Sequence, residues 1–157
     1  MLRVNKLTDY ATVVLIDIAR AGGRQSSHHI ADHTGIPLPT VAKLMKSLSR
    51  AGLVASRRGA TGGYVLGRDT AAITIADVIE AVEGPIALTA CADTSEEHCG
   101  IENICPVHGK WNRVNTAVCD ALKQVTLADM VADVAGFGID PADLPARPAA
   151  TAPLAAQ

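Results

Sequence analysis

The chain has 157 residues, of which 48% are hydrophobic and 3% are aromatic. This length suits one compact domain with an appendage and is short for a two-domain enzyme. Charges such as Asp17 and Asp93 interrupt the apolar runs, so none reaches the roughly 20 residues that cross a bilayer. The start of the chain carries Asp9 and no small-residue cleavage site, which argues against a signal peptide. We therefore expect a cytoplasmic protein without a membrane segment.

Charge is distributed unevenly along the chain. Residues 1–70 carry a net charge of +6 and residues 71–157 a net charge of −8, which leaves −2 overall. A basic half joined to an acidic half is typical of a protein that presents one end to a polyanion. An uneven solvated surface has the same composition, so charge alone does not decide between the two.

The first part of the chain begins with two predicted helices. Apolar residues recur at helical spacing over 7–18, and Gly22 follows them as a stop signal. A second helix is predicted over residues 28–34, because serines at 26–27 can cap its start and Gly35 can end it. These helices are short and lie close together in the sequence.

A third helix is predicted to run to about Ala51, with Pro37 and Pro39 in its lead-in or first turn. Its expected buried stripe consists of Val41, Leu44, Met45 and Leu48. The outward face is basic and hydroxylic, and its candidate DNA contacts are Thr40, Lys43 and Lys46. The second and third predicted helices are short and are joined by a glycine-containing turn, which suits a helix-turn-helix. In that motif the later helix, here the third, enters the major groove of DNA.

Residues 53–66 have the pattern of a β-hairpin with a glycine-rich tip, which would be a wing directly after the helix-turn-helix. The tip carries Arg57 and Arg58, and its small residues allow close approach to a phosphate backbone or a minor groove. An ordinary exposed turn also commonly contains arginines. Helix-turn-helix, wing and local positive charge together favour binding to double-stranded DNA.

Two further helices are predicted in the acidic half. The first spans Thr74–Val82, with Thr74 as the cap and Asp77 at the third helical position. The longest helix follows Cys105-Pro106 and runs to about Val125, with apolar residues at intervals of three or four. These residues are Val107, Trp111, Val114, Val118 and Leu122. Such a stripe often belongs to a protein's own core, but here we expect it to form a homodimer interface, because an isolated helix of this length must bury one face.

A last short helix is predicted over Thr126–Val134, before the composition turns to alanine, proline and aspartate. We therefore divide the chain into a winged helix-turn-helix over 1–70, a loop with dimerisation helices over 71–135, and a disordered tail over 136–157. The predicted fold class is mainly α with a small β-hairpin.

The loop before the longest helix carries Cys91, Cys99 and Cys105, and His108 follows three residues later. Three thiols and one imidazole within a short segment make a set of metal ligands. Gaps of seven and five residues do not form the tight knuckles of structural zinc sites, and they favour a larger iron–sulfur cluster. A zinc site and a thiol redox sensor remain as alternatives. Cys119 lies on the predicted helix beside the apolar stripe and is left out of the site.

The sequence resembles the IscR-type winged-helix regulators of the Rrf-two family, most closely the branch that controls the SUF iron–sulfur assembly operon. The resemblance covers about residues 1–132. The matching segments are KLTDYATVVL, GIPLPTVAKLMKSLSRAGLVASRRGATGGYVL, ITIADVIEAVEGPIALTAC, CPVHGKWNRVN and VTLADM.

The resemblance implies a cluster-sensing repressor of iron–sulfur cluster assembly genes. The family's three cluster cysteines match Cys91, Cys99 and Cys105, and the histidine that completes a 2Fe–2S site matches His108. In nitric-oxide-sensing relatives an acidic residue of the partner subunit is the fourth ligand, and its position matches Asp9. The family therefore favours a 2Fe–2S cluster over a 4Fe–4S cluster. No acid–base pair surrounds a predicted pocket, so we expect neither an enzyme nor a small-molecule substrate.

Overall fold

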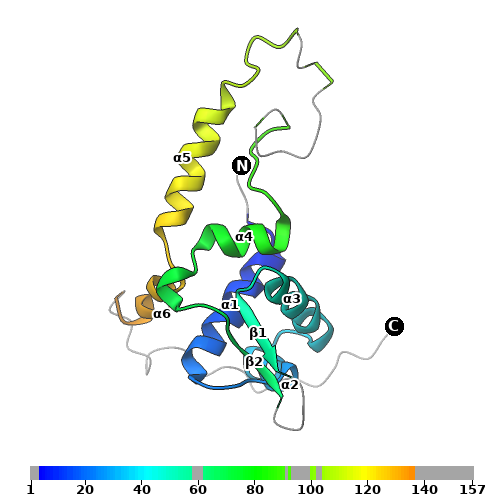
Figure 1. Ribbon diagram of the computed structural model, residues 1–157, viewed down its shortest axis with the longest axis vertical. Helices are drawn as coiled ribbons and strands as arrows, with labels where there is room; N and C mark the ends of the chain where they lie inside the picture. Colours follow the sequence, from blue (N-terminus) through cyan, green and yellow to red (C-terminus); the bar gives the residue numbers. More distant parts are fainter. Residues whose placement is uncertain (1–3, 58–61, 91, 93–99, 102–103, 137–157) are drawn as a thin grey trace.

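The computed structural model describes residues 4–57, 62–90, 92, 100–101 and 104–136. It agrees with the predicted fold class, since the named elements of the described residues are helices and one antiparallel hairpin (Figure 1). The elements in chain order are α1 (Lys6–Ala21), α2 (Ser27–Thr34), α3 (Leu38–Arg50), β1 (Val54–Arg57), β2 (Gly63–Leu66), the short 3-10 helix η1 (Thr70–Ala72), α4 (Ile75–Glu83), α5 (Trp111–Gln124) and α6 (Leu127–Gly136). Gly136, the first residue of the predicted tail 136–157, is the last residue of α6, and residues 137–157 lie outside the described residues.

The predicted stop signal Gly22 and the predicted cap Ser26 are confirmed, whereas the cap of α1 is Asn5, which was not predicted. The Asn5 side chain accepts a hydrogen bond from the Leu7 amide at the start of α1, and Ser26 accepts one from the His29 amide at the start of α2. Gly22 ends α1 in the left-handed conformation, with a φ angle of 61°. Short polar side chains thus satisfy amides that have no partner within the helix.

One hydrophobic core joins the two halves of the sequence. The predicted stripe of α3 is buried, and Leu15 of α1 and Ile30 of α2 pack with it. Ile73, Val78 and Leu127, which come from the acidic half, are buried in the same cluster. Helix α4 therefore packs against α1 and α3, and α6 packs against α1, whereas α5 extends away from the first three helices (Figure 1).

The hairpin is held against the start of α2. Strand β1 pairs with β2 so that Val54 faces Leu66 and Arg57 faces Gly63. The amide of Gln25 donates to the Tyr64 carbonyl at 3.0 Å, and the Tyr64 amide donates to the Gln25 carbonyl at 2.8 Å. These two bonds extend the hairpin by one residue of the α1–α2 connection and fix its direction.

The helix that was predicted to be the longest, α5, has 14 residues and is shorter than the 16-residue α1. We expected it to start at Cys105-Pro106, whereas α5 begins at Trp111. Residues 105–110 form turns instead, and Gly109 has a φ angle of 69°, which breaks a continuous helix. Cys105 therefore lies in a separate turn before α5 and not at the first position of that helix.

A short backbone pairing attaches the far end of α5 to the core. The Ile75 amide donates to the Val125 carbonyl at 2.9 Å, and the Leu127 amide donates to the Ile73 carbonyl at 2.7 Å. Thr74 and Thr126 face each other in this antiparallel bridge. We call the paired residues 73–75 and 125–127 the junction.

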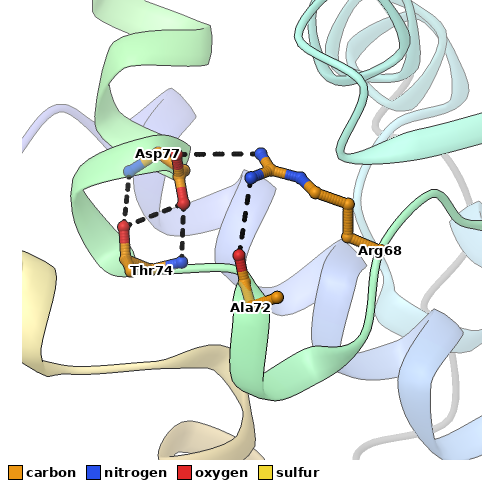
Figure 2. Close-up of polar contacts among 4 residues, drawn as sticks. All are labelled: Arg68, Ala72, Thr74 and Asp77. Atoms are coloured by element: carbon orange, nitrogen blue, oxygen red, sulfur yellow. Dashed lines mark hydrogen bonds and ion pairs between the residues drawn. The ribbon is translucent and has the colours of Figure 1, made fainter.

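The helix that starts at the junction has the predicted capping box. Figure 2 shows the Asp77 carboxylate accepting hydrogen bonds from the amide and hydroxyl of Thr74, at 2.8 and 2.9 Å. Arg68 lies beside it, 3.7 Å from Asp77, and donates to the Ala72 carbonyl at 3.4 Å. Burial raises the pKa of Asp77, but the bonds from Thr74 and the positive charge of Arg68 outweigh it and lower the pKa below its ordinary value.

A substitution at Gly63 tests how the hairpin is fixed. A Cβ atom there would lie 2.8 Å from the Gln25 carbonyl oxygen, and the φ angle of 154° is one that side chains rarely adopt. We expect Gly63→Ala to destabilise the fold by about 1–3 kcal/mol in urea unfolding, because it opposes the Gln25–Tyr64 pairing. Gly23→Ala is the control, since its nearest neighbour would lie at an ordinary 3.8 Å. Equal stability of the two variants would contradict this account.

Candidate DNA-binding surface and cysteine loop

Helix α3 presents a basic face opposite its buried stripe. Lys43 and Lys46 are exposed, and Thr40 is half-buried near the start of the helix. The three side chains follow each other at intervals of three residues, so they lie along one side of α3. The buried residues on the other side leave this face pointing away from the core.

The hairpin adds a second basic element next to α3. Arg57 is exposed at the end of β1, whereas Arg58 lies outside the described residues. A shallow hollow beside Arg57 is lined by serines, glycines and an aromatic side chain, namely Ser26, Ser27, Ser56, Gly62, Gly63 and Tyr64. Its hydroxyl groups lie next to the start of α2, where helix amides favour a negative charge. The sequence predicts Ser26 and Ser27 only as helix caps, because their contact with the hairpin depends on the tertiary fold.

Two of the candidate metal ligands belong to the described residues before α5. Cys105 is a half-buried free thiol and His108 is exposed. The His108 amide donates to the Cys105 carbonyl at 3.2 Å, so both residues belong to one turn. Cys91 and Cys99 lie outside the described residues. Among the described residues alone, no group of three or more histidine, cysteine or acidic side chains could hold a metal ion.

Asn115 is a buried polar residue that the sequence analysis missed. It is 5% exposed and lies on α5 against residues 86–88, which lead from α4 into the cysteine loop. Its neighbour one turn later, Cys119, is half-buried and contacts the same segment. A polar residue beside an apolar stripe was the available signal, but sequence spacing does not reveal what such a residue contacts.

An apolar row lies exposed along the start of α5 and the turn before it. Val107, Trp111 and Val114 have exposed fractions of 46%, 42% and 45%, and Ile104 is 83% exposed. Val118 and Leu122, which complete the predicted stripe, are half-buried. Side chains of this size are normally covered, and such a continuous row is typical of an interface.

A groove of about 1000 Å³ lies where the start of α1 meets α4, α6 and the end of α5. Its apolar lining consists of Val4, Ile75, Ile79, Leu122, Val125 and Met130, and Asp9 stands at its edge, exposed. Ile75 and Ile79 of α4 are half-buried and line this groove. Beside it, Glu83 accepts hydrogen bonds from the Asn5 amide at 3.2 Å and from the Thr8 hydroxyl.

No helix within the described ranges is both long and apolar enough to cross a bilayer.

The chain is similar to known regulators over most of its length. A family model described as "Rrf2: Iron-dependent Transcriptional regulator" matches residues 4–133. The HTH-type transcriptional regulator IscR of Yersinia pseudotuberculosis is 33% identical over 132 residues, which cover 83% of this chain and 79% of that protein. IscR of Vibrio cholerae is 33% identical over 135 residues, which cover 84% of this chain and 76% of that protein.

Solved structures agree with the sequence comparison. T. potens IscR has a TM-score of 0.64 at 28% identity, covering 88% of this chain and 93% of the other. CymR, described as the global cysteine regulator of B. subtilis, has a TM-score of 0.63 at 32% identity, covering 85% and 98%. These findings confirm the predicted winged-helix fold and the family resemblance. The chain therefore belongs to the Rrf2 family of transcriptional regulators and is itself a DNA-binding regulator.

Proposed function

We propose that this regulator is a homodimeric repressor of iron–sulfur cluster assembly genes and that it senses cluster status through a bound 2Fe–2S cluster. The observation that carries the proposal is the turn with Cys105 and His108, which continues directly into α5. A cluster held there lies next to the helix that we assign to dimerisation. Its gain or loss can therefore change how two DNA-binding units are arranged.

We assign DNA recognition to α3 and the hairpin. Thr40, Lys43 and Lys46 would meet base edges or phosphates in the major groove. Arg57 and Arg58 would meet phosphates or the minor groove. The hollow beside Arg57 and the start of α2 suits a phosphate group, because it combines a cation with hydroxyl groups and helix amides.

Two single substitutions separate base reading from phosphate contact. The test uses the DNA duplex that the wild-type protein selects from a random pool. On this duplex Lys43→Ala should weaken the free energy of binding by about 1–3 kcal/mol and relax the sequence preference. Arg57→Ala should weaken binding to all sequences alike and lower the salt slope of log affinity by about 1. Both are measured by fluorescence anisotropy at several salt concentrations. Lys123→Ala, on α5, is the control, and affinities equal to this control would contradict the assignment.

The candidate ligands suit an iron–sulfur cluster by their chemistry. Cysteine thiolates are its usual protein ligands, and histidine replaces cysteine in some 2Fe–2S centres. The described residues place a free thiol and an imidazole on one turn. We propose Cys91, Cys99, Cys105 and His108 as the ligands, with Asp9 of a partner subunit as the alternative to His108. When bound, the cluster supplies a redox-active, iron-containing group. The chain's own residues hold it beside α5 and away from the basic face of α3.

The two described cysteines give a matched test of the site. After anaerobic reconstitution, the wild-type protein and Cys119→Ala should show visible absorption and bound iron and sulfide. Cys105→Ala should be colourless or lose most of its absorption, because it lacks one of the thiolate ligands. Metal analysis completes the measurement. A colourless wild-type protein with stoichiometric zinc would support the zinc-stabilised alternative, and full colour in Cys105→Ala would remove this residue from the site.

A thiol-based regulator is the second candidate function. The similarity to CymR, a regulator named for cysteine, favours it, as do the free thiols of Cys105 and Cys119. In that case, oxidation of the thiols in metal-free protein changes DNA affinity and reduction restores it. The iron–sulfur proposal instead expects the DNA affinity to follow cluster content.

The exposed row and the groove together support a homodimer. Each chain has both an exposed apolar row, with Val107, Trp111 and Val114, and an apolar groove that could receive such a row from a second chain. In a twofold dimer each surface can be used twice, since the two interfaces are equivalent. A partner's row in the groove would also bring its cysteine loop toward Asp9.

A charge placed in the row tests the dimer. Val114→Glu should convert the protein to a monomer in size-exclusion chromatography with light scattering, because an interface cannot bury an unpaired carboxylate. The fold should be retained, since Val114 is already 45% exposed. Thr116→Glu, at an exposed position on the same helix, should stay dimeric. A dimeric Val114→Glu would refute this interface.

A further inference from the structure

The side chain of Asn115 bonds to two backbone groups of the segment that leads into the cysteine loop. Its Nδ2 donates to the Ile86 carbonyl at 3.0 Å, and its Oδ1 accepts from the Leu88 amide at 2.9 Å. The orientation of the amide group follows from these partners, because a carbonyl cannot donate and an amide N–H cannot accept. Asn115 thus binds residues 86–88 as the backbone of a neighbouring strand would.

Cys119 strengthens the same attachment from the next turn of α5. Its Sγ lies 3.9 Å from the Ile86 carbonyl oxygen and 3.8 Å from Nδ2 of Asn115. Positions 115 and 119 are four residues apart, so both side chains lie on the side of α5 that faces residues 86–88. The contacts explain why a small polarisable side chain lies at position 119.

The attachment closes the base of the cysteine loop. Leu88 is bound three residues before Cys91, and Asn115 lies one helical turn after Trp111, where α5 begins. All four candidate ligands, Cys91, Cys99, Cys105 and His108, lie between residues 88 and 115. A loop whose ends are held together loses less conformational entropy when its side chains converge on one ligand.

We propose that Asn115 is a positioning residue that closes the cysteine loop on α5 and thereby preorganises the cluster ligands. The inference rests on the proposed cluster function but concerns a residue that touches no cluster. It also joins the loop to the helix that we assign to dimerisation, through a side chain that is itself buried. Loss of these bonds leaves the Ile86 carbonyl and the Leu88 amide without this partner and lets the loop's base open.

Hydrogen exchange of the cluster-free protein tests the closure itself. In Asn115→Ala the Leu88 amide should exchange about tenfold faster or more than in the wild type, while amides of α1 keep their rates. Asn115→Asp retains an acceptor for the Leu88 amide and loses the donor to the Ile86 carbonyl. It should therefore protect Leu88 better than Asn115→Ala does. Thr116→Ala is the control, and an unchanged Leu88 rate in both Asn115 variants would refute the closure.

Cluster loss tests what the closure does. Reconstituted wild-type protein and Thr116→Ala should release iron to a chelator at the same slow rate, followed by visible absorption. Asn115→Ala should release it roughly tenfold faster, as expected for removal of a residue that supports metal ligands. The rate of iron release from Asn115→Asp should lie between those of the wild type and Asn115→Ala, because the aspartate keeps one of the two hydrogen bonds. Thermal unfolding of the cluster-free variants checks whether a general loss of stability causes the faster release instead.

The outcomes separate this inference from the proposed function. If the wild-type protein holds no cluster after reconstitution, the proposed function fails and preorganisation of a cluster fails with it. If the wild-type protein holds a cluster and Asn115→Ala releases it as slowly as Thr116→Ala, only the inference about Asn115 fails. Faster release together with faster Leu88 exchange supports it.

Discussion

The junction between residues 73–75 and 125–127 is the constraint on which the rest of the structure depends. The two paired segments are alike, because each continues into a helix through a threonine–aspartate capping pair, Thr74 with Asp77 and Thr126 with Asp129. Each threonine amide is bonded to its own aspartate, so the flanking residues make the bonds across the junction. Ile73 and Leu127 are fully buried beside it. The end of α5 is thereby anchored in the core of the DNA-binding unit.

Helix α4 connects this anchored helix with the rest of the molecule. It packs against α1, α3 and α5, and it ends where the segment toward the cysteine loop begins. At that end Glu83 bonds to Asn5 and Thr8 at the start of α1, one residue from Asp9. The loop is therefore attached at its entrance through α4 and Glu83, and at its exit through α5 and the junction. Both attachments reach α4, which packs against α3, and the one through Glu83 also reaches α1, which packs against α3 as well.

Local signals in the sequence predict most of the fold. The two errors discussed below have the same cause, because backbone conformation and backbone partners leave no pattern in the sequence. The capping box at Thr74, the cap at Ser26 and the buried stripe of α3 depend on residues close in the chain, so their positions follow from spacing. The start of α5 was predicted too early, because a proline after Cys105 is a helix-start signal and the conformation of Gly109 is not visible in the sequence. The role of Asn115 was missed for a similar reason. Its partners are backbone groups of residues 86 and 88, which no pattern of side chains records.

The separation of the two sites sets what a sensing mechanism must achieve. Figure 1 shows the turn before α5 at one end of the molecule and the hairpin toward the other, so a group in the cysteine loop and DNA at the wing act on different ends. To change operator occupancy substantially, the two states must differ by a few kcal/mol in DNA affinity. The proposed dimer would obtain this difference by changing the spacing of its two recognition helices, since half-sites lie about 34–36 Å apart on DNA. In the proposed mechanism α5 would transmit a movement of the loop to a whole DNA-binding unit, because α5 is anchored at the junction and bonded to residues 86 and 88 through Asn115.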